Sequence, residues 1–193
     1  MACAASGAAA AAAAAASSGS FGIATGDAVR KFLLGRWRFS RKLDYRMGGG
    51  RGTMVGSADF NELPQKPGAL LYEERGMVEL EGMGKPFEAY RKYLFNTNTW
   101  PVEVYFVDDP SKKSKPSLIP ELDFHTSYFI PLVFEEVKKP MIEARPPHLC
   151  IDDIYSGAMS IHNEHSFEWR WSITGPKKDG DICAKYERDD SSL

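Results

Sequence analysis

From residue 35 onward, apolar and polar side chains alternate along the chain with a period of two. Successive side chains of a β-strand point to opposite faces, so this pattern predicts strands with one face turned towards a core. The first run extends from Trp37 to Arg46 and stops at the glycine triplet 48–50, which can adopt the positive φ angles of a hairpin turn. A second alternating run follows as far as Phe60. The chain is therefore predicted to open with a β-hairpin.

Further strands are expected at the spacing typical of an antiparallel meander. They are predicted at about residues 69–75, 77–82, 87–95, 102–107, 148–161, 167–174 and 182–186. The total of about eight to nine strands is enough for a sheet to close on itself, which removes its exposed edges. We therefore predict an all-β, antiparallel up-and-down β-barrel. A short N-terminal helix from Gly26 to Leu34, capped by Asp27, is expected to close one end.

Two segments depart from this alternation. Residues 1–26 carry no charged side chain and include nine consecutive alanines, so we expect a disordered Ala/Ser-rich leader. Residues 108–147 are rich in proline and are predicted to form a long insertion or lid. Within it we expect a brief strand at Phe124–His125 and a short helix from Leu132 to Lys139. Residues 27–193 are thus predicted to form a single barrel domain.

Composition narrows the choice of partner and compartment. The net charge of −2 gives no electrostatic reason to expect binding to nucleic acid. The sequence contains no run of 18 or more large apolar residues, so no membrane-spanning helix is predicted. Three cysteines are an odd number, and a reducing compartment explains them most simply. We expect a cytoplasmic protein. The alternative is a plastid protein, if the acid-free Ala/Ser leader is a transit peptide.

Several motifs resemble known proteins. The entry of a short helix into Gly35-Arg36-Trp37 is similar to the opening of lipocalins and other calycins. That resemblance implies that Trp37 packs across the closed end of the barrel and meets a basic residue of the last strand, Arg188 or Lys185. A more specific, ordered set is Gly35-Arg36-Trp37, Leu71-Tyr72-Glu73-Glu74, Arg91-Lys92-Tyr93-Leu94-Phe95, His148-x-Cys150-x-x-Asp153-x-Tyr155 and Trp169-x-Trp171-x-Ile173-x-Gly175-Pro176-x-Lys178. Over most of residues 32–188 this set resembles the family known as domain of unknown function 6314, which implies a lipocalin-like barrel and no particular activity.

The densest cluster of reactive side chains is His148, Cys150 and Asp152. Strand alternation places all three on one face, unless a bulge at Asp152 and Asp153 changes the parity. Together they outline a nucleophilic Cys-His-acid site, and with His125 as a fourth ligand they could bind zinc or iron. We favour the structural alternative, in which Cys150 is a small buried apolar group, His148 is hydrogen-bonded and the aspartates form a turn. No cofactor or metal is assigned.

Two arginines are predicted to point into the barrel. Arg41 shares a face with Phe39, and Arg91 shares a face with Phe87. A cation facing an apolar interior is costly unless it is paired. Both are therefore candidates to bind the acidic group of a ligand, unless a carboxylate such as Glu73 neutralises them.

These observations favour a lipocalin-like barrel that binds a small apolar or amphipathic molecule at the mouth of the barrel. Tyr93, Phe106, Trp169 and Trp171 are expected to line the pocket, with the 108–147 loop as its gate. The candidate ligand-binding residues are Arg41, Arg91, Tyr93, Phe106, His125, His148, Tyr155, Trp169 and Trp171.

Three alternatives stay open on the same fold. One is an enzyme that uses His148, Cys150 and Asp152, which ranks below a binding protein. Another is a haem or metal protein that uses His125 or His148. The third is a filled barrel that acts as an interaction module. The sequence does not indicate an oligomeric state.

Overall fold

The computed structural model describes residues 23, 25–107, 126–138 and 141–189. The predicted leader lies outside these residues apart from 23, 25 and 26, and so do residues 108–125 of the predicted insertion, including Phe124 and His125. The described part contains one helix, α1 (Gly26–Leu33), and twelve strands. The strands are β1 (Gly35–Met47), β2 (Arg51–Glu62), β3 (Ala69–Leu80), β4 (Phe87–Asn96), β5 (Val102–Val107), β6 (Thr126–Leu132), β7 (Phe134–Lys138), β8 (Met141–Ala144), β9 (Pro147–Cys150), β10 (Asp153–Asn163), β11 (Ser166–Thr174) and β12 (Asp179–Arg188).

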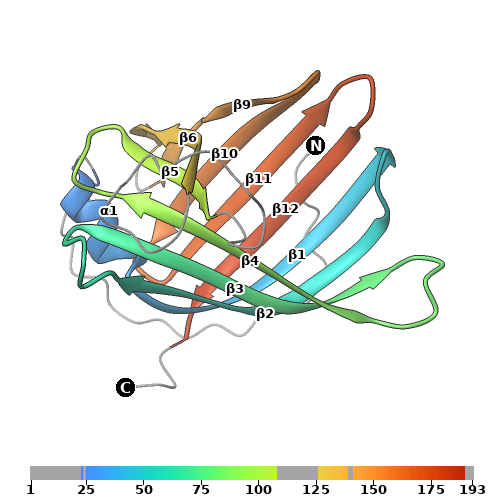
Figure 1. Ribbon diagram of the computed structural model, residues 1–193, viewed down its shortest axis with the longest axis horizontal. Helices are drawn as coiled ribbons and strands as arrows, with labels where there is room; N and C mark the ends of the chain where they lie inside the picture. The colour runs from blue at the N-terminus through green and yellow to red at the C-terminus, as the bar shows by residue number, and fades with distance from the viewer. Residues whose placement is uncertain (1–22, 24, 108–125, 139–140, 190–193) are drawn as a thin grey trace.

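All strands belong to one antiparallel sheet that curls into a nearly closed barrel (Figure 1). Their order is β6-β5-β4-β3-β2-β1-β12-β11-β10-β8-β7, with β9 also paired to β10. The predicted all-β antiparallel barrel is confirmed, with twelve strands in place of eight or nine. The helix α1 has eight residues, too few for a helix that spans a bilayer.

Three predicted elements, one helix and two strand boundaries, differ from the structure. The helix expected from Leu132 to Lys139 is wrong, because this segment contains β7, which finds a ladder partner in β8. The expected break between residues 75 and 77 is absent, because β3 runs straight through Gly76. Gly76 marks a close approach of strands: a Cβ atom there would lie 2.5 Å from the carbonyl oxygen of Val55. The single strand expected at 148–161 is instead divided by a turn at Ile151 and Asp152.

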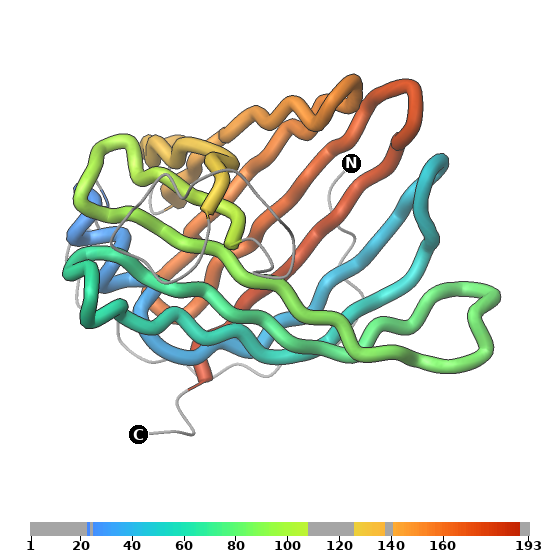
Figure 2. Tube along the Cα trace, viewed as in Figure 1, coloured from blue at the N-terminus to red at the C-terminus, as the bar shows by residue number. Residues whose placement is uncertain are grey.

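The barrel closes through the segment that was expected to be an insertion. Strands β6 and β7 are separated by Val133 alone, yet β6 pairs with β5 while β7 pairs with β8. These two strands are the opposite ends of the path through the sheet. One nearly continuous stretch of chain therefore joins both ends of the sheet, as the trace in Figure 2 shows.

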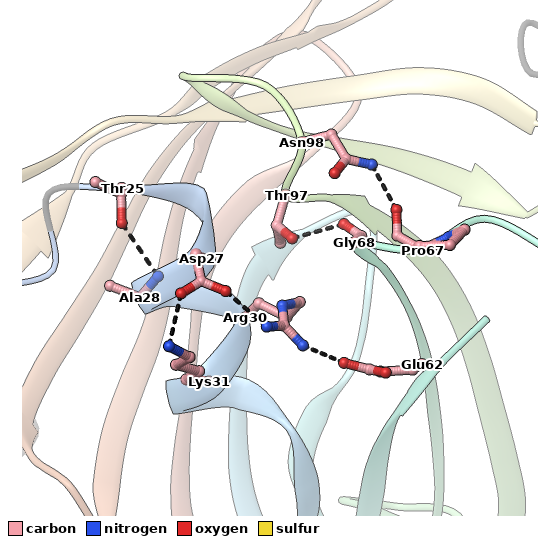
Figure 3. A network of polar contacts seen from close by, with 10 residues as sticks. All are labelled: Thr25, Asp27, Ala28, Arg30, Lys31, Glu62, Pro67, Gly68, Thr97 and Asn98. Atoms are coloured by element: carbon pink, nitrogen blue, oxygen red, sulfur yellow. Dashed lines mark hydrogen bonds and ion pairs between the residues drawn. The ribbon is translucent and has the colours of Figure 1, made fainter. Parts of the chain in front are cut away.

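The helix α1 closes one end of the barrel (Figure 1). Its N-cap is Thr25, whose Oγ1 accepts a hydrogen bond of 3.2 Å from the backbone N–H of Ala28. The predicted cap, Asp27, lies within the first turn and forms ion pairs with Arg30 and Lys31 (Figure 3). An acidic side chain is favourable there because the helix dipole is positive at its N-terminus.

The side chains beneath α1 form the sealed end of the core. Trp37 is fully buried, and its Nε1 donates a hydrogen bond of 2.8 Å to the carbonyl oxygen of Leu33. Arg188 lies over the Trp37 ring and donates to the backbone oxygens of Phe32 and Leu34. The basic partner expected for Trp37 is thus Arg188, whereas Lys185 is exposed. Arg188 also binds the last carbonyl groups of α1, which are otherwise left without partners in a helix.

Candidate functional site

A cavity of about 300 Å³ lies inside the barrel, away from the sealed end. Its walls are the inward faces of β1 to β4, β11 and β12, as period-two alternation requires, apart from Gly50 before β2 and the exposed Tyr90, which has the outward parity of β4. Aromatic side chains dominate these walls, and they are Tyr45, Tyr72, Phe87, Tyr90, Tyr93, Trp169, Trp171 and Tyr186. The cavity is at the small end of the range found for ligand sites in proteins.

An ion pair between β1 and β3 forms the polar part of the cavity wall. Arg41 forms a bidentate ion pair with Glu74, in which Nη1 donates to Oε1 at 2.8 Å and Nη2 donates to Oε2 at 2.6 Å. Arg41 Nη2 also donates to the Tyr186 hydroxyl at 3.2 Å. The Tyr72 hydroxyl donates to Glu74 Oε2 and lies 3.1 Å from the Tyr186 hydroxyl. Each of the four side chains therefore has its partner within the group.

Burial and charge fix the protonation of this group. Burial alone would raise the pKa of Glu74, but the hydrogen bonds and positive charge of Arg41 outweigh it, so the pKa lies below its ordinary value. Burial raises the pKa of both Tyr72 and Tyr186. The group thus holds a charged carboxylate and two neutral phenols near neutral pH.

The inward position predicted for Arg41 is found, but its predicted partner is wrong. Glu73 points outwards and forms an ion pair of 2.5 Å with Lys92. The next residue, Glu74, shares the inward face of β3 with Tyr72. The alternation along β3 could have indicated Glu74, because Tyr72, Glu74 and Val78 occupy one parity of the strand.

Arg91, the second arginine predicted to face inwards, lines the cavity from β4. It is exposed to solvent and donates a hydrogen bond of 2.9 Å from Nη1 to the Tyr93 hydroxyl. Its Cζ atom lies 5.8 Å from the centroid of the same ring. Among the described residues, no ion pair is found for Arg91.

The wall opposite β4 presents Trp169 and Trp171, whose stacked rings are 6.0 Å apart. Trp169 Nε1 is buried and has no hydrogen-bond partner in the described part of the chain. Two further buried atoms lack a hydrogen bond, Glu143 Oε1 and Arg170 Nε, but each lies in an ion pair of less than 3 Å. Of these three atoms, Trp169 Nε1 alone has neither a hydrogen bond nor an ion pair in the described part of the chain.

A second aromatic group seals the gap between β6 and β9. The ring of Phe129 lies 4.3 Å from Phe106, 5.4 Å from Tyr93 and 4.7 Å from His148, centroid to centroid. His148 Nδ1 lies 3.2 Å from the carbonyl oxygen of Phe129, which can only accept, so this nitrogen is the donor. Phe106 therefore packs at this seam and is not among the residues that line the cavity. Phe129 fell in the predicted insertion and was not expected in the wall.

The turn at Ile151 and Asp152 takes Asp152 out of the strand that carries His148 and Cys150. It pairs His148 with Tyr155 and Cys150 with Asp153 across the β9–β10 hairpin, so the parity differs from simple alternation. Asp152 is exposed in the turn. No hydrogen bond joins the side chains of His148, Cys150 and Asp152 in the described part of the chain.

Asp153 has a structural role, since its Oδ1 accepts hydrogen bonds from the backbone N–H groups of Lys177 and Lys178, at 3.0 and 3.2 Å. It fixes the β11–β12 turn beside the hairpin. Tyr155 accepts a hydrogen bond of 3.1 Å from Lys178 Nζ. No group of three or more potential metal ligands is found within the residues that the structure describes. His125, the proposed fourth ligand, lies outside them.

Comparison with known proteins identifies the family. Residues 33–188 match the family of unknown function DUF6314. The chain belongs to DUF6314. The resemblance noted from the ordered motifs is thereby confirmed. A search of the curated proteins gives no match for this DUF6314 chain.

Solved structures similar to this DUF6314 protein are barrels. A redesigned β-barrel has a TM-score of 0.36 at 10% identity, with coverage of 83% of this chain and 95% of that one. A fluorescence-activating β-barrel of de novo design has a TM-score of 0.34 at 12% identity, covering 83% and 97%. The protein EF1p2_mFAP2b bound to DFHBI has a TM-score of 0.35 at 11% identity, covering 82% and 95%. These are distant likenesses, and the proposals below rest on the residues of this chain.

Proposed function

We propose that the barrel binds a small amphipathic organic molecule in its interior. The observation that carries this proposal is the cavity of about 300 Å³, which has aromatic walls and a few polar groups at fixed positions. Such a mixture is typical of ligand sites, in which apolar walls supply affinity and a few polar groups set orientation. A filled barrel, in contrast, would have side chains in this volume.

The polar group around Arg41 supports a preformed site. Its hydrogen bonds are complete without a ligand, so it holds the inward faces of β1, β3 and β12 together whether or not the cavity is occupied. A ligand then meets walls that need little rearrangement, which limits the entropic cost of binding. The exposed position of Asp152 in the turn, outside the strand of His148 and Cys150, favours this binding role over the nucleophilic site.

The test is binding of a neutral fluorescent probe, N-phenyl-1-naphthylamine, to the full chain. We expect saturable binding with increased probe emission. Ala89 lines the cavity on β4, so Ala89→Phe fills part of the volume and is expected to weaken binding about tenfold, which corresponds to about 1.4 kcal/mol.

The neighbouring residue Glu88 is exposed and provides the matched control. Glu88→Phe adds the same ring to the opposite face of β4 and should leave probe affinity unchanged. An absence of saturable binding to the wild type, or equal affinities for wild type and Ala89→Phe, would contradict the proposed function.

A further inference from the structure

We infer that the ligand is an organic anion, with an apolar ring system held in the cavity and an acidic group bound by Arg91. This inference rests on the proposed binding function and names the chemical class of its ligand. It depends on the balance of charges and of hydrogen-bond donors in the cavity wall.

The charges that line the cavity do not cancel. Its wall contains two arginines, Arg41 and Arg91, and one carboxylate, Glu74. Both oxygens of Glu74 are bound by Arg41, and one of them also accepts from Tyr72. The positive charge of Arg41 is thus neutralised by Glu74. The positive charge of Arg91 is left over in the cavity wall.

Arg91 differs from the neighbouring cation, Lys92, in the partner that each side chain has. Lys92 points outwards and has a carboxylate, Glu73, at 2.5 Å. The inward-facing Arg91 lies opposite Glu74 in the β3–β4 ladder, but both oxygens of that carboxylate are bound by Arg41. The direct hydrogen-bond partner of Arg91 is the hydroxyl of Tyr93, a neutral group that accepts one of its five N–H donors. The remaining donors form a planar fork that matches the geometry of a carboxylate, sulfonate or phosphate group.

Trp169 also lines the cavity, but its indole donor does not face it. Trp169 Nε1 is buried, and no acceptor for it is found among the residues that the structure describes. An indole N–H can only donate, but this nitrogen has almost no accessible surface, so a ligand in the cavity does not reach it. Arg91 is therefore the cationic donor open to a ligand, while the carboxylate in the wall is already paired.

The position of Arg91 lowers the cost of binding a charged group. Strand β5 pairs with β4 only from Tyr93 to Asn96, whereas β3 pairs with the whole length of β4. At Arg91, the edge of β4 that faces away from β3 therefore has no described strand beside it. Arg91 is exposed there, and Phe87, on the same face of β4, also lines the cavity. An acidic group at Arg91 keeps part of its hydration while its apolar body enters the barrel.

The test compares two probes that share one ring system. 1-Anilinonaphthalene-8-sulfonate carries an acidic group that N-phenyl-1-naphthylamine lacks. We expect the wild-type full chain to bind the sulfonate more tightly. Arg91→Gln should weaken sulfonate binding about tenfold and change binding of the neutral probe less than twofold, while Arg91→Lys should recover part of the loss.

Lys92→Gln is the matched control, because it removes the same charge from the outer face of β4. It should leave both affinities unchanged. Tighter binding of the neutral probe by the wild type, or equal weakening of both probes by Arg91→Gln, overturns the anion assignment and leaves the binding function intact. Failure of both probes to bind the wild type contradicts the binding function itself.

Discussion

The guanidinium of Arg188 lies over the indole ring of Trp37, with its Cζ atom 4.2 Å from the ring centroid. The contact joins β12, which carries Arg188, to β1, which carries Trp37. The two residues are also partners in the β1–β12 ladder. The same guanidinium binds the backbone oxygens of Phe32 and Leu34. One side chain thus fastens the helix, the first strand and the last strand at the sealed end.

We expect Arg188→Ala to lower the free energy of unfolding by about 2 kcal/mol, through loss of a cation–π contact and of charge-assisted hydrogen bonds. Urea denaturation of the full chain measures this change. Lys185→Ala is the control, because Lys185 is exposed on the same strand, and its effect should stay within about 0.5 kcal/mol. Equal effects of the two substitutions would show that Arg188 does not fasten the sealed end.

The pair of Arg41 and Glu74 gives a second prediction. Glu74→Leu leaves the buried guanidinium without its carboxylate and should destabilise the protein by about 3 to 5 kcal/mol. The double variant Arg41→Met/Glu74→Leu removes both charges and should recover most of this loss. Unfolding free energies of the wild type, both single variants and the double variant form the required cycle. Additive effects would mean that the two side chains do not interact.

The stability provided by Glu74 should also depend on pH. Its pKa in the folded protein is lowered below the ordinary value of 4.5, so the carboxylate stabilises the fold fully above that value. The contribution is lost as the pH falls through the lower pKa of the folded state. The difference in unfolding free energy between wild type and Glu74→Gln should therefore shrink between about pH 7 and pH 3. A difference that stays constant over this interval would refute the assignment.

Ile151 offers a stabilising substitution. Its φ angle is +60°, in the left-handed region that a β-branched residue rarely adopts, and its side chain is 76% exposed. Ile151→Asn should raise the unfolding free energy by about 1 kcal/mol, because asparagine tolerates this region and little buried apolar area is lost. Gly82 is the converse control: it has φ of +79° and open space around it, so Gly82→Ala should be destabilising. A loss of stability in Ile151→Asn would contradict this account.

At the seam, His148→Ala removes the hydrogen bond to Phe129 and the ring contact between them. We expect a loss of about 1 to 2 kcal/mol and faster hydrogen exchange in β6. The adjacent Leu149 is 67% exposed, so Leu149→Ala should leave both measurements nearly unchanged. If His148→Ala matched that control, the seam would be held by other contacts.

Much of the wall could be predicted from local pattern alone. Alternation placed Trp37, Arg41, Tyr93 and Trp169 on inward faces, and the turn at residues 48–50 fits the φ of +72° at Gly48. These features depend on short-range sequence, because one strand and its hairpin partner define both faces. Glu74 follows the same alternation, since it shares the inward parity of β3 with Tyr72.

The features that were missed depend on distant partners. Strand β7 has charged and β-branched residues next to proline, a composition that also suits a short helix, and only the presence of β8 beside it decides the outcome. The turn at Ile151 likewise runs against the intrinsic preference of isoleucine. Phe129 joins the wall because β6, which begins at Thr126, pairs with β5, which ends at Val107.

The pairing of β1 with β12 has a consequence for synthesis of the protein on the ribosome. One edge of β1 pairs with β12. That partner strand exists only after every residue between Met47 and Asp179 has been synthesised. Until then the nascent chain carries an unpaired strand edge that can pair with other chains, a recognised route to aggregation. The charged residues Arg36, Arg38 and Lys42, which alternate along the outer face of β1, are the kind of side chain that discourages such pairing during this interval.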